Sequence, residues 1–240
     1  SYAVGLAEML IKGQNADHFL HADSLKEDCF KDISMRFVLE NPPFGTPWAG
    51  KDAKQGQEDE VRKEYAKGKS SRWAAGLPSG GDSQLLFLQS AINKMDEHLG
   101  RAAIIENGSP LFTGGTASGE SQIRRWLLDN DLIEAIIQMP TDLFYNTGIS
   151  TYIWILSKNK RPERKKKIQL IDASSIYHKL RKPLGNKKNE FSPEDRAKIT
   201  KLYSDFQEND LCKIYSNNEF KYREYAVMQP LQRSYSITQA

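Results

Sequence analysis

Four consecutive residues, Asn41-Pro42-Pro43-Phe44, combine groups that suit chemistry on an amino group. The Asn41 side chain and the Pro42 main chain each offer a carbonyl oxygen, and the two prolines stiffen the chain that carries them. Two fixed acceptors directed at one place suit a planar –NH₂ group, which has two protons to donate. Acceptors arranged for a more tetrahedral nitrogen would stabilise that group as it attacks an electrophile. Phe44 can stack on the flat group, as a base extruded from a duplex requires.

The residues before this tetrapeptide predict where it lies. Residues 35–39 are typical of a buried strand, and in open α/β sheets the reacting groups lie just past the carboxyl ends of strands. A residue before proline avoids helical geometry, so both Asn41 and Pro42 should be extended. The sequence therefore predicts a stiff tip at the end of a strand. The alternative is a strand-terminating turn in which Phe44 only fills the core.

Apolar periodicity predicts how the rest of the chain positions this tip. Helical spacing marks residues 2–11, 83–95 and 118–130, and a cap with a proline at the first turn predicts a further helix at 192–207, followed by an extended tail. Extended segments are also predicted at 18–21, 35–39, 101–107, 132–139, 151–157 and 168–174. Such alternation predicts an α/β fold with a mainly parallel sheet covered on both faces. The segment between 132–139 and 151–157 has no helical pattern, so these two strands can pair as an antiparallel hairpin at the sheet edge.

The polar stretch at residues 45–81 contains Trp48 and Trp73 and is too long for an ordinary connection. It is predicted either to be a mobile functional loop or to be partly helical around residues 58–67. If the tip binds a base, this stretch should border the nucleic acid.

Composition excludes several classes of protein. The chain is 240 residues long, with 39% hydrophobic and 27% charged residues and a net charge of +3, and it has no apolar run of membrane-spanning length. We therefore expect no membrane contact and a cytoplasmic location. Cysteines and histidines lack metal-ligand spacing, so no metal site is predicted. Two basic runs, at residues 158–167 and 179–188, are either solvated turns or phosphate contacts.

The tetrapeptide resembles the catalytic signature of amino-group methyltransferases that use S-adenosylmethionine. The surrounding sequence is more specific, because five segments in order resemble the modification (M) subunit of type I restriction–modification systems. They are NPPFG, GLPSGGDSQLLFLQ, GRAAIIENGSPLFTGG, IRRWLLDNDLIEAIIQMPTDLFYNTGISTYIWIL and, more weakly, FKYREYAVMQPL. The ENGS stretch departs from the proline-containing form expected there.

This resemblance implies a function, a cofactor and partners. It implies a site-specific, adenine-N6 DNA methyltransferase that transfers a methyl group from S-adenosylmethionine to DNA. Asn41, Pro42, Pro43 and Phe44 would form the catalytic site. The partners would be DNA and the specificity and restriction subunits of the same system, in a hetero-oligomer.

The resemblance also implies a Rossmann-like class I methyltransferase sheet that lacks its first strands. Such enzymes hold the cofactor on a glycine-rich loop after the first strand and an acidic residue after the second, and neither precedes the helix at residues 2–11. Asp23 matches an acidic residue that lies near the cofactor's adenine amino group. We therefore expect a partial catalytic domain at residues 1–175, with most of the cofactor site absent, and a C-terminal extension at residues 176–240.

A glycine-rich segment, GGTASGES at residues 114–121, has the spacing of a phosphate-binding loop. Glu120 stands where that motif needs lysine, and a carboxylate there would repel phosphate. We interpret the segment as a flexible loop that Ser118 caps into the following helix.

Two alternatives to the DNA methyltransferase remain open. The same chemistry can act on RNA or on a protein glutamine, because the tetrapeptide does not specify which amine it binds. The chain can also be a non-catalytic docking module for partner subunits, although a scaffold has no use for this tip.

Overall fold

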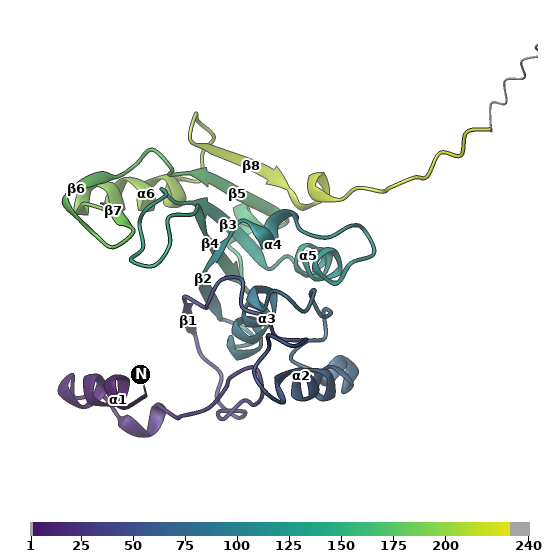
Figure 1. Cartoon of the computed structure of the whole chain (residues 1–240). Coiled ribbons are helices and arrows are strands. Elements are labelled where there is room, and N and C mark those ends of the chain that lie inside the picture. Colours follow the sequence, from purple (N-terminus) through teal and green to yellow (C-terminus); the bar gives the residue numbers. More distant parts are fainter. Residues whose placement is uncertain (1, 231–240) are drawn as a thin grey trace, which may run out of the picture.

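The computed structural model describes residues 2–230, which form a central sheet, a separate two-stranded hairpin and six α-helices (Figure 1). The helices are α1 (Tyr2–Ile11), α2 (Gln57–Tyr65), α3 (Gln84–Lys94), α4 (Ser109–Phe112), α5 (Gly119–Asp129) and α6 (Pro193–Asp205). The strands are β1 (Phe37–Glu40), β2 (Arg101–Asn107), β3 (Ile133–Gln138), β4 (Thr151–Ser157), β5 (Lys167–Asp172), β6 (His178–Leu184), β7 (Lys187–Glu190) and β8 (Cys212–Ser216). Short 3₁₀ turns are η1 (Ala16–His18), η2 (Gly68–Ser70), η3 (Pro162–Arg164) and η4 (Asn217–Phe220).

The central sheet has six strands in the order β1-β2-β4-β3-β5-β8. Strands β1, β2, β3 and β5 run in one direction, whereas β4 and β8 run in the opposite direction. This confirms the predicted α/β class, the mainly parallel sheet and the antiparallel hairpin of β3 with β4. The hairpin lies inside the sheet and not at its edge, because β2 pairs with β4 on one side and β5 pairs with β3 on the other.

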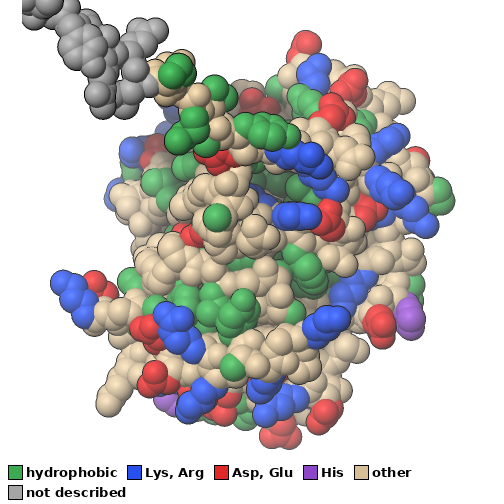
Figure 2. Space-filling view, turned by 90° about the vertical axis from the view of Figure 1, so that its right-hand side faces the viewer, with side chains coloured by type: hydrophobic (Ala, Val, Ile, Leu, Met, Phe, Trp, Pro, Cys, Tyr) green, Lys and Arg blue, Asp and Glu red, His purple; other side chains and the backbone are tan. Residues whose placement is uncertain are grey.

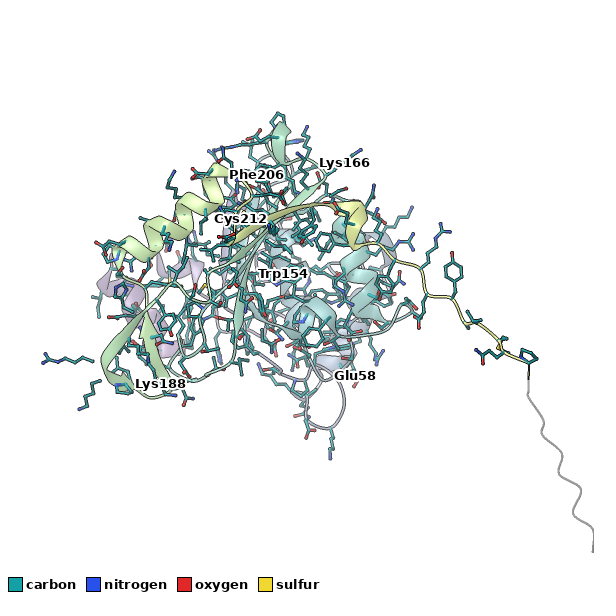
Figure 3. All side chains as sticks on the ribbon, turned by 90° about the horizontal axis from the view of Figure 1, so that it is seen from above. Glu58, Trp154, Lys166, Lys188, Phe206 and Cys212 are labelled. Atoms are coloured by element: carbon teal, nitrogen blue, oxygen red, sulfur yellow. The ribbon has the colours of Figure 1, made fainter. Side chains whose placement is uncertain are left out.

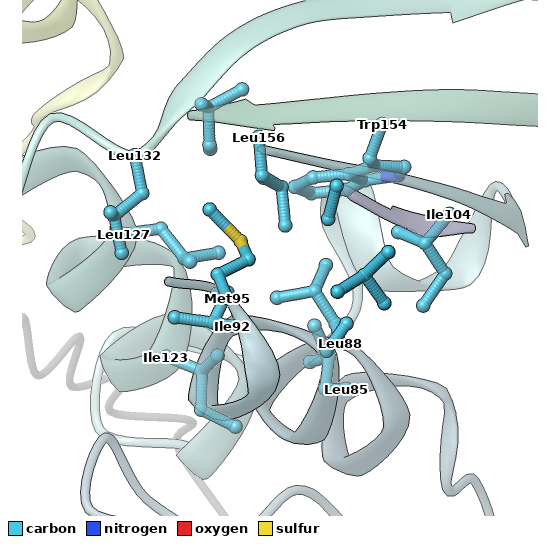
Figure 4. Packing of buried hydrophobic residues seen from close by; sticks show 14 of the residues in the cluster. Leu85, Leu88, Ile92, Met95, Ile104, Ile123, Leu127, Leu132, Trp154 and Leu156 are labelled. Atoms are coloured by element: carbon cyan, nitrogen blue, oxygen red, sulfur yellow. The ribbon is translucent and has the colours of Figure 1, made fainter. Parts of the chain in front are cut away.

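One face of the sheet packs against α3 and α5, and Figure 4 shows the cluster of buried side chains between them. The sheet contributes alternate residues such as Ile104, Trp154 and Leu156, because successive side chains of a strand point to opposite faces. Leu88 and Leu127 are fully buried against them from the two helices. The helical spacing predicted at 83–95 and 118–130 is confirmed, and it places the apolar stripes on this face.

The opposite face packs against α6, which begins with a capping box between Ser192 and Asp195 and a proline at its first turn. Its residues Ile199 and Leu202 pack on a cluster that includes Ile171 and, from β8, Cys212. Residues after 175 therefore contribute a strand and a covering helix to the same sheet. The division into domains at residue 175 stays a prediction.

The polar stretch at residues 45–81 folds around a second apolar cluster and contains α2, as one of the two predicted alternatives requires. Trp48 and Trp73 are 2% and 0% exposed and pack with Val61 of α2 and Leu86 of α3. Burial of two large aromatic side chains is strongly favourable, so this stretch is an ordered part of the fold.

Two sequence predictions differ from the structure. Residues 18–21 lie in the end of η1 and in irregular chain and not in a strand, since no neighbouring strand pairs with them in the part of the chain that the structure describes. In the basic run 158–167, Lys160 and Arg164 are buried and neither solvated nor free for phosphate. Lys160 Nζ lies 2.6 Å from Asp131 Oδ1, and Arg164 Nη1 donates to Gln169 at 2.9 Å.

Within residues 2–230, no helix combines the length and apolar character needed to cross a membrane.

Candidate functional site

The Asn41 tip, residues 41–44, directly follows β1, at the end of the sheet where the parallel strands finish. Asn41 is exposed, Pro42 is buried and Phe44 is half-buried. Among the described residues, neither the Asn41 side chain nor the Pro42 carbonyl oxygen has a hydrogen-bond partner. The tip therefore keeps both acceptors free, as the predicted chemistry requires, and Phe44 is partly available for stacking.

The chain after the tip is held in place by the segment before α3. Gly45 has a φ of +59°, which turns the chain away from the strand. The Thr46 carbonyl then accepts from the Ser83 N–H at 3.0 Å, and the Trp48 N–H donates to the Gly80 carbonyl at 2.9 Å. These bonds fix the polar stretch beside the tip, which limits the freedom of the tip itself.

Three carboxyl groups gather behind the tip. Glu40 is the last residue of β1, and Glu106 lies on the same face of neighbouring β2, two positions beyond the residue that pairs with Glu40. Glu106 is 0% exposed, and both its carboxylate oxygens lack hydrogen-bond partners within residues 2–230. Burial raises the pKa of Glu106 well above its ordinary value, and the negative charges of Asp82 and Glu40 raise it further. Both effects favour the protonated form of this carboxyl group.

A buried amide connects this group to the start of α3. Gln84 Nε2 donates to Asp82 Oδ2 at 2.8 Å and to Asn107 Oδ1 at 3.0 Å, while its oxygen accepts from the Asn107 N–H at 2.8 Å. Helix α3 is thereby fastened to the carboxyl end of β2, next to the strand that carries the tip. A fully satisfied buried network of this kind makes the surrounding backbone rigid.

Burial raises the pKa of Glu40 to about 7 from an ordinary value of 4.5. Because the folded state holds the proton more tightly than the unfolded state, this side chain favours folding below pH 4.5, and the contribution is lost as the pH rises through about 7. We expect Glu40→Gln to leave stability at pH 4 nearly unchanged and to be more stable than the wild type at pH 8. Urea denaturation at the two pH values measures this, with the exposed Glu27→Gln as control. An equal difference between Glu40→Gln and wild type at both pH values would contradict the prediction.

Asp23 is half-buried, and its carboxylate is already engaged. Oδ1 accepts from the Leu25 N–H at 3.1 Å, and Gln57 Nε2 donates to Oδ2 at 3.0 Å. Lys54 Nζ lies 3.4 Å from Oδ2, and the Lys54 side chain is 68% exposed. An exposed ion pair contributes at most about 1 kcal/mol, so a ligand amine can replace Lys54 at low cost. The cofactor role of Asp23 stays a prediction.

The glycine-rich segment at residues 114–121 serves packing. Ser118 caps α5 by accepting from the Ser121 N–H, as predicted, and the Glu120 carboxylate accepts from the Ser79 N–H at 2.7 Å. A Cβ at Gly119 would lie 1.7 Å from the Leu77 carbonyl oxygen, so only glycine allows this close approach. The segment joins α5 to the chain that follows the tip.

A large cavity, about 1030 Å³ in volume, lies away from the tip, between one face of β3, β5 and β8, helix α5 and residues 220–225. Figure 2 looks onto this side of the molecule, where hydrophobic side chains line a hollow with Lys and Arg at its border. No tip residue lines the cavity. At the tip, Asn41 is exposed and Phe44 is half-buried, whereas Pro42 is buried.

Sequence reasoning missed the carboxyl groups behind the tip. Their only signal was strict alternation, because Val38 with Glu40, and Ile104 with Glu106, occupy equivalent inward positions of two predicted buried strands. The pattern was visible, but a buried carboxyl group costs free energy and is not expected there. The bridging role of Gln84 had no signal, because its partners are distant in sequence.

The fold is similar to solved structures of methyltransferase subunits. The type I restriction–modification methyltransferase subunit from Streptococcus thermophilus superposes with a TM-score of 0.71 and 25% identity, over 88% of this chain and 41% of that chain. The M protein of the EcoKI type I restriction enzyme shows the same fold, with a TM-score of 0.57 and 21% identity. The sheet, with antiparallel β4 inside it, is that of a Rossmann-like class I methyltransferase.

Sequence comparison identifies the family. The family model described as N-6 DNA methylase matches residues 1–236, and the chain belongs to that family. The MjaVIII methylase subunit of Methanocaldococcus jannaschii is 34% identical over 189 residues, which are 78% of this chain and 30% of that protein. The HindI methylase subunit of Haemophilus influenzae is 26% identical over 95% of this chain and 48% of that protein. The chain thus spans less than half of each of these relatives.

Proposed function

We propose that this chain is the catalytic side of a DNA adenine-N6 methyltransferase, the modification subunit of a type I restriction–modification system. The observation that supports this most is the exposed Asn41 tip with two acceptors that no described residue occupies, at the carboxyl end of a strand in a methyltransferase fold. The names of the relatives, all methylase subunits of type I restriction enzymes, support the same assignment.

The tip residues bind and orient the amino group. The side-chain oxygen of Asn41 and the main-chain oxygen of Pro42 accept its two N–H bonds, and Pro43 keeps the tip stiff. Acceptors placed for a tetrahedral nitrogen bind the amine more strongly as its lone pair leaves the ring and attacks, which lowers the barrier. Phe44, half-buried, stacks on the flipped base.

S-adenosylmethionine would supply the electrophilic methyl group when bound. Among the described residues, Asp23 fits a contact to that cofactor, because its carboxylate can exchange the exposed Lys54 for a ligand amine. The carboxyl groups of Glu40, which is half-buried, and of Glu106, which is fully buried, lie behind the tip.

The partners follow from the relatives and are likewise proposals. An M subunit of this type would act on DNA together with specificity and restriction subunits, and it would work in the cytoplasm. The polar stretch at residues 45–81 would border the DNA beside the tip, because backbone hydrogen bonds fix it there.

Transfer of labelled methyl groups tests the assignment and its alternatives. The complete protein, with its partner subunits, is incubated with labelled S-adenosylmethionine and, separately, with DNA, RNA and protein. We expect label in DNA, and nuclease digestion should release it as N6-methyladenine. Label in RNA or in glutamine would favour the second substrate class. Proper assembly without any transfer would favour a docking module.

A further inference from the structure

The β6–β7 hairpin concentrates positive charge. Residues 178–190 contain five basic residues and one acidic residue, whereas the whole chain has a net charge of only +3. Among the described residues, no acidic group lies within ion-pair distance of Lys179, Arg181 or Lys182, and all three are exposed. Lys188 Nζ is loosely paired, 3.5 Å from Asp142 Oδ2. The hairpin therefore presents free cationic groups to solvent.

The hairpin is held firmly although it buries almost none of its own side chains. An isolated two-stranded hairpin is marginal in water, but this one docks on the loop between β3 and β4. The Lys188 N–H donates to the Asp142 carbonyl at 2.9 Å, and Asn189 Nδ2 donates to the Thr141 carbonyl at 2.8 Å. At its turn, the Asn186 N–H donates to the Tyr145 carbonyl at 3.0 Å. The cationic groups thus have a fixed place in the molecule.

That place is the end of the sheet where the parallel strands finish, which is also where the Asn41 tip lies. The hairpin follows the carboxyl end of β5, and β5 runs in the same direction as β1. The loop on which it docks begins at the carboxyl end of β3, at the same end of the sheet. The other basic run, 158–167, connects β4 to the start of β5 and so lies at the opposite end of the sheet, where the parallel strands begin. Figure 3 shows Lys188 and Lys166, one from each run, on different sides of the molecule.

We propose that the β6–β7 hairpin binds the phosphate backbone of the DNA that flanks the base held at the Asn41 tip. This inference rests on the proposed function and adds a contact surface to it. Lys179, Arg181 and Lys182 are the groups that contact phosphate. Such contacts position a duplex without reading its sequence, which suits a chain whose proposed partner subunit reads the bases.

The spacing of the two sites suits a single duplex. Four inter-strand steps of about 4.8 Å separate β1, which carries the tip, from β5, which leads into the hairpin, so these two strands lie roughly 19 Å apart in the sheet. At about 3.4 Å per base pair, this corresponds to about five or six base pairs. One DNA segment can therefore contact the hairpin while its target base is at the tip.

A matched pair of double variants tests the inference in the complete protein with its partner subunits. Arg181→Gln/Lys182→Gln removes two charges from the hairpin. Arg161→Gln/Lys165→Gln removes two exposed charges from the segment between β4 and β5, at the opposite end of the sheet. Binding of a fluorescent, adenine-containing DNA duplex is measured across a range of salt concentrations. We expect the hairpin variant to bind on the order of ten-fold more weakly, and its slope of log affinity against log salt to be smaller by roughly two. The control variant should match the wild type, and the charge-retaining Arg181→Lys/Lys182→Arg should keep the affinity.

The outcomes separate this inference from the proposed function. DNA affinity tests the hairpin, whereas methyl transfer to DNA tests the function. Equal affinity of the hairpin variant and wild type would overturn the inference even if methylation is observed. Equal losses in both double variants would also overturn it, because they would show only a general effect of charge. Unchanged DNA affinity with weaker assembly of the partner subunits would assign the hairpin to a protein contact instead.

Discussion

Replacing Asn41 with alanine in the complete protein should reduce methyl transfer by at least about 100-fold, the usual effect of removing one preorganised hydrogen-bonding group that acts in a transition state. Asn41 is exposed at the end of β1, and no described residue accepts or donates a hydrogen bond to its side chain. Its loss therefore removes an acceptor for the amino group without leaving a buried group unpaired. Stability should change by less than about 0.5 kcal/mol.

The measurement is the single-turnover rate of methyl transfer to DNA, together with DNA affinity. Affinity should stay near the wild-type value, because one neutral amide at the tip contributes no phosphate contact. Asn41→Asp is the matched variant, since its carboxylate keeps an oxygen acceptor, and it should retain more activity than Asn41→Ala. A turnover of Asn41→Ala above one tenth of the wild-type rate would remove the tip from the mechanism.

The position of this tip could be predicted because it depends on local chemistry. An apolar strand followed by Asn-Pro-Pro leaves the chain few conformations, and the carboxyl end of a strand is where open sheets carry their functional groups. The helices predicted from periodicity at 83–95 and 118–130 were likewise local features, and both are present.

Long-range partners explain what could not be predicted. The place of the β3–β4 hairpin inside the sheet depends on β5 and β8, whose pairing is set by contacts far apart in sequence. Lys160 and Arg164 belong to a run of charges that is usually solvated, yet Asp131 and Glu134 pair with them from distant positions. The burial of Trp48 and Trp73 could not be predicted either, because both lie in a mainly polar stretch of sequence.

The buried network around Glu134 gives the second large expected effect. Glu134 of β3 is 2% exposed, and Arg101 of β2 donates to its carboxylate at 3.2 Å. Tyr203 of α6 also donates to Glu134, and Arg101 donates to the Tyr203 hydroxyl at 2.6 Å. Arg164, itself 2% exposed, lies with its Nε 3.6 Å from the same carboxylate. One carboxylate thus interacts with two guanidinium groups and, through Tyr203, fastens α6 to the sheet.

We expect Glu134→Ala to lower the free energy of unfolding by about 3–5 kcal/mol, because it leaves a buried arginine without its counter-charge. Urea denaturation measures this loss, and faster hydrogen exchange in α6 should accompany it. The matched control is Asp205→Ala on the same helix, which removes an ion pair to Lys201 whose side chains are 75% and 43% exposed. That change should cost less than about 1 kcal/mol.

Glu134→Gln separates the charge from the shape of the side chain. The amide oxygen can still accept from Tyr203, but the charge that compensates Arg101 and Arg164 is lost, so its stability should lie between that of Glu134→Ala and the wild type. Because the network includes residues on both sides of position 175, loss of Glu134 should lower the stability of the sheet and of α6 together. A separate unfolding transition of α6, with the sheet unaffected, would instead show that the C-terminal extension folds independently of the catalytic part.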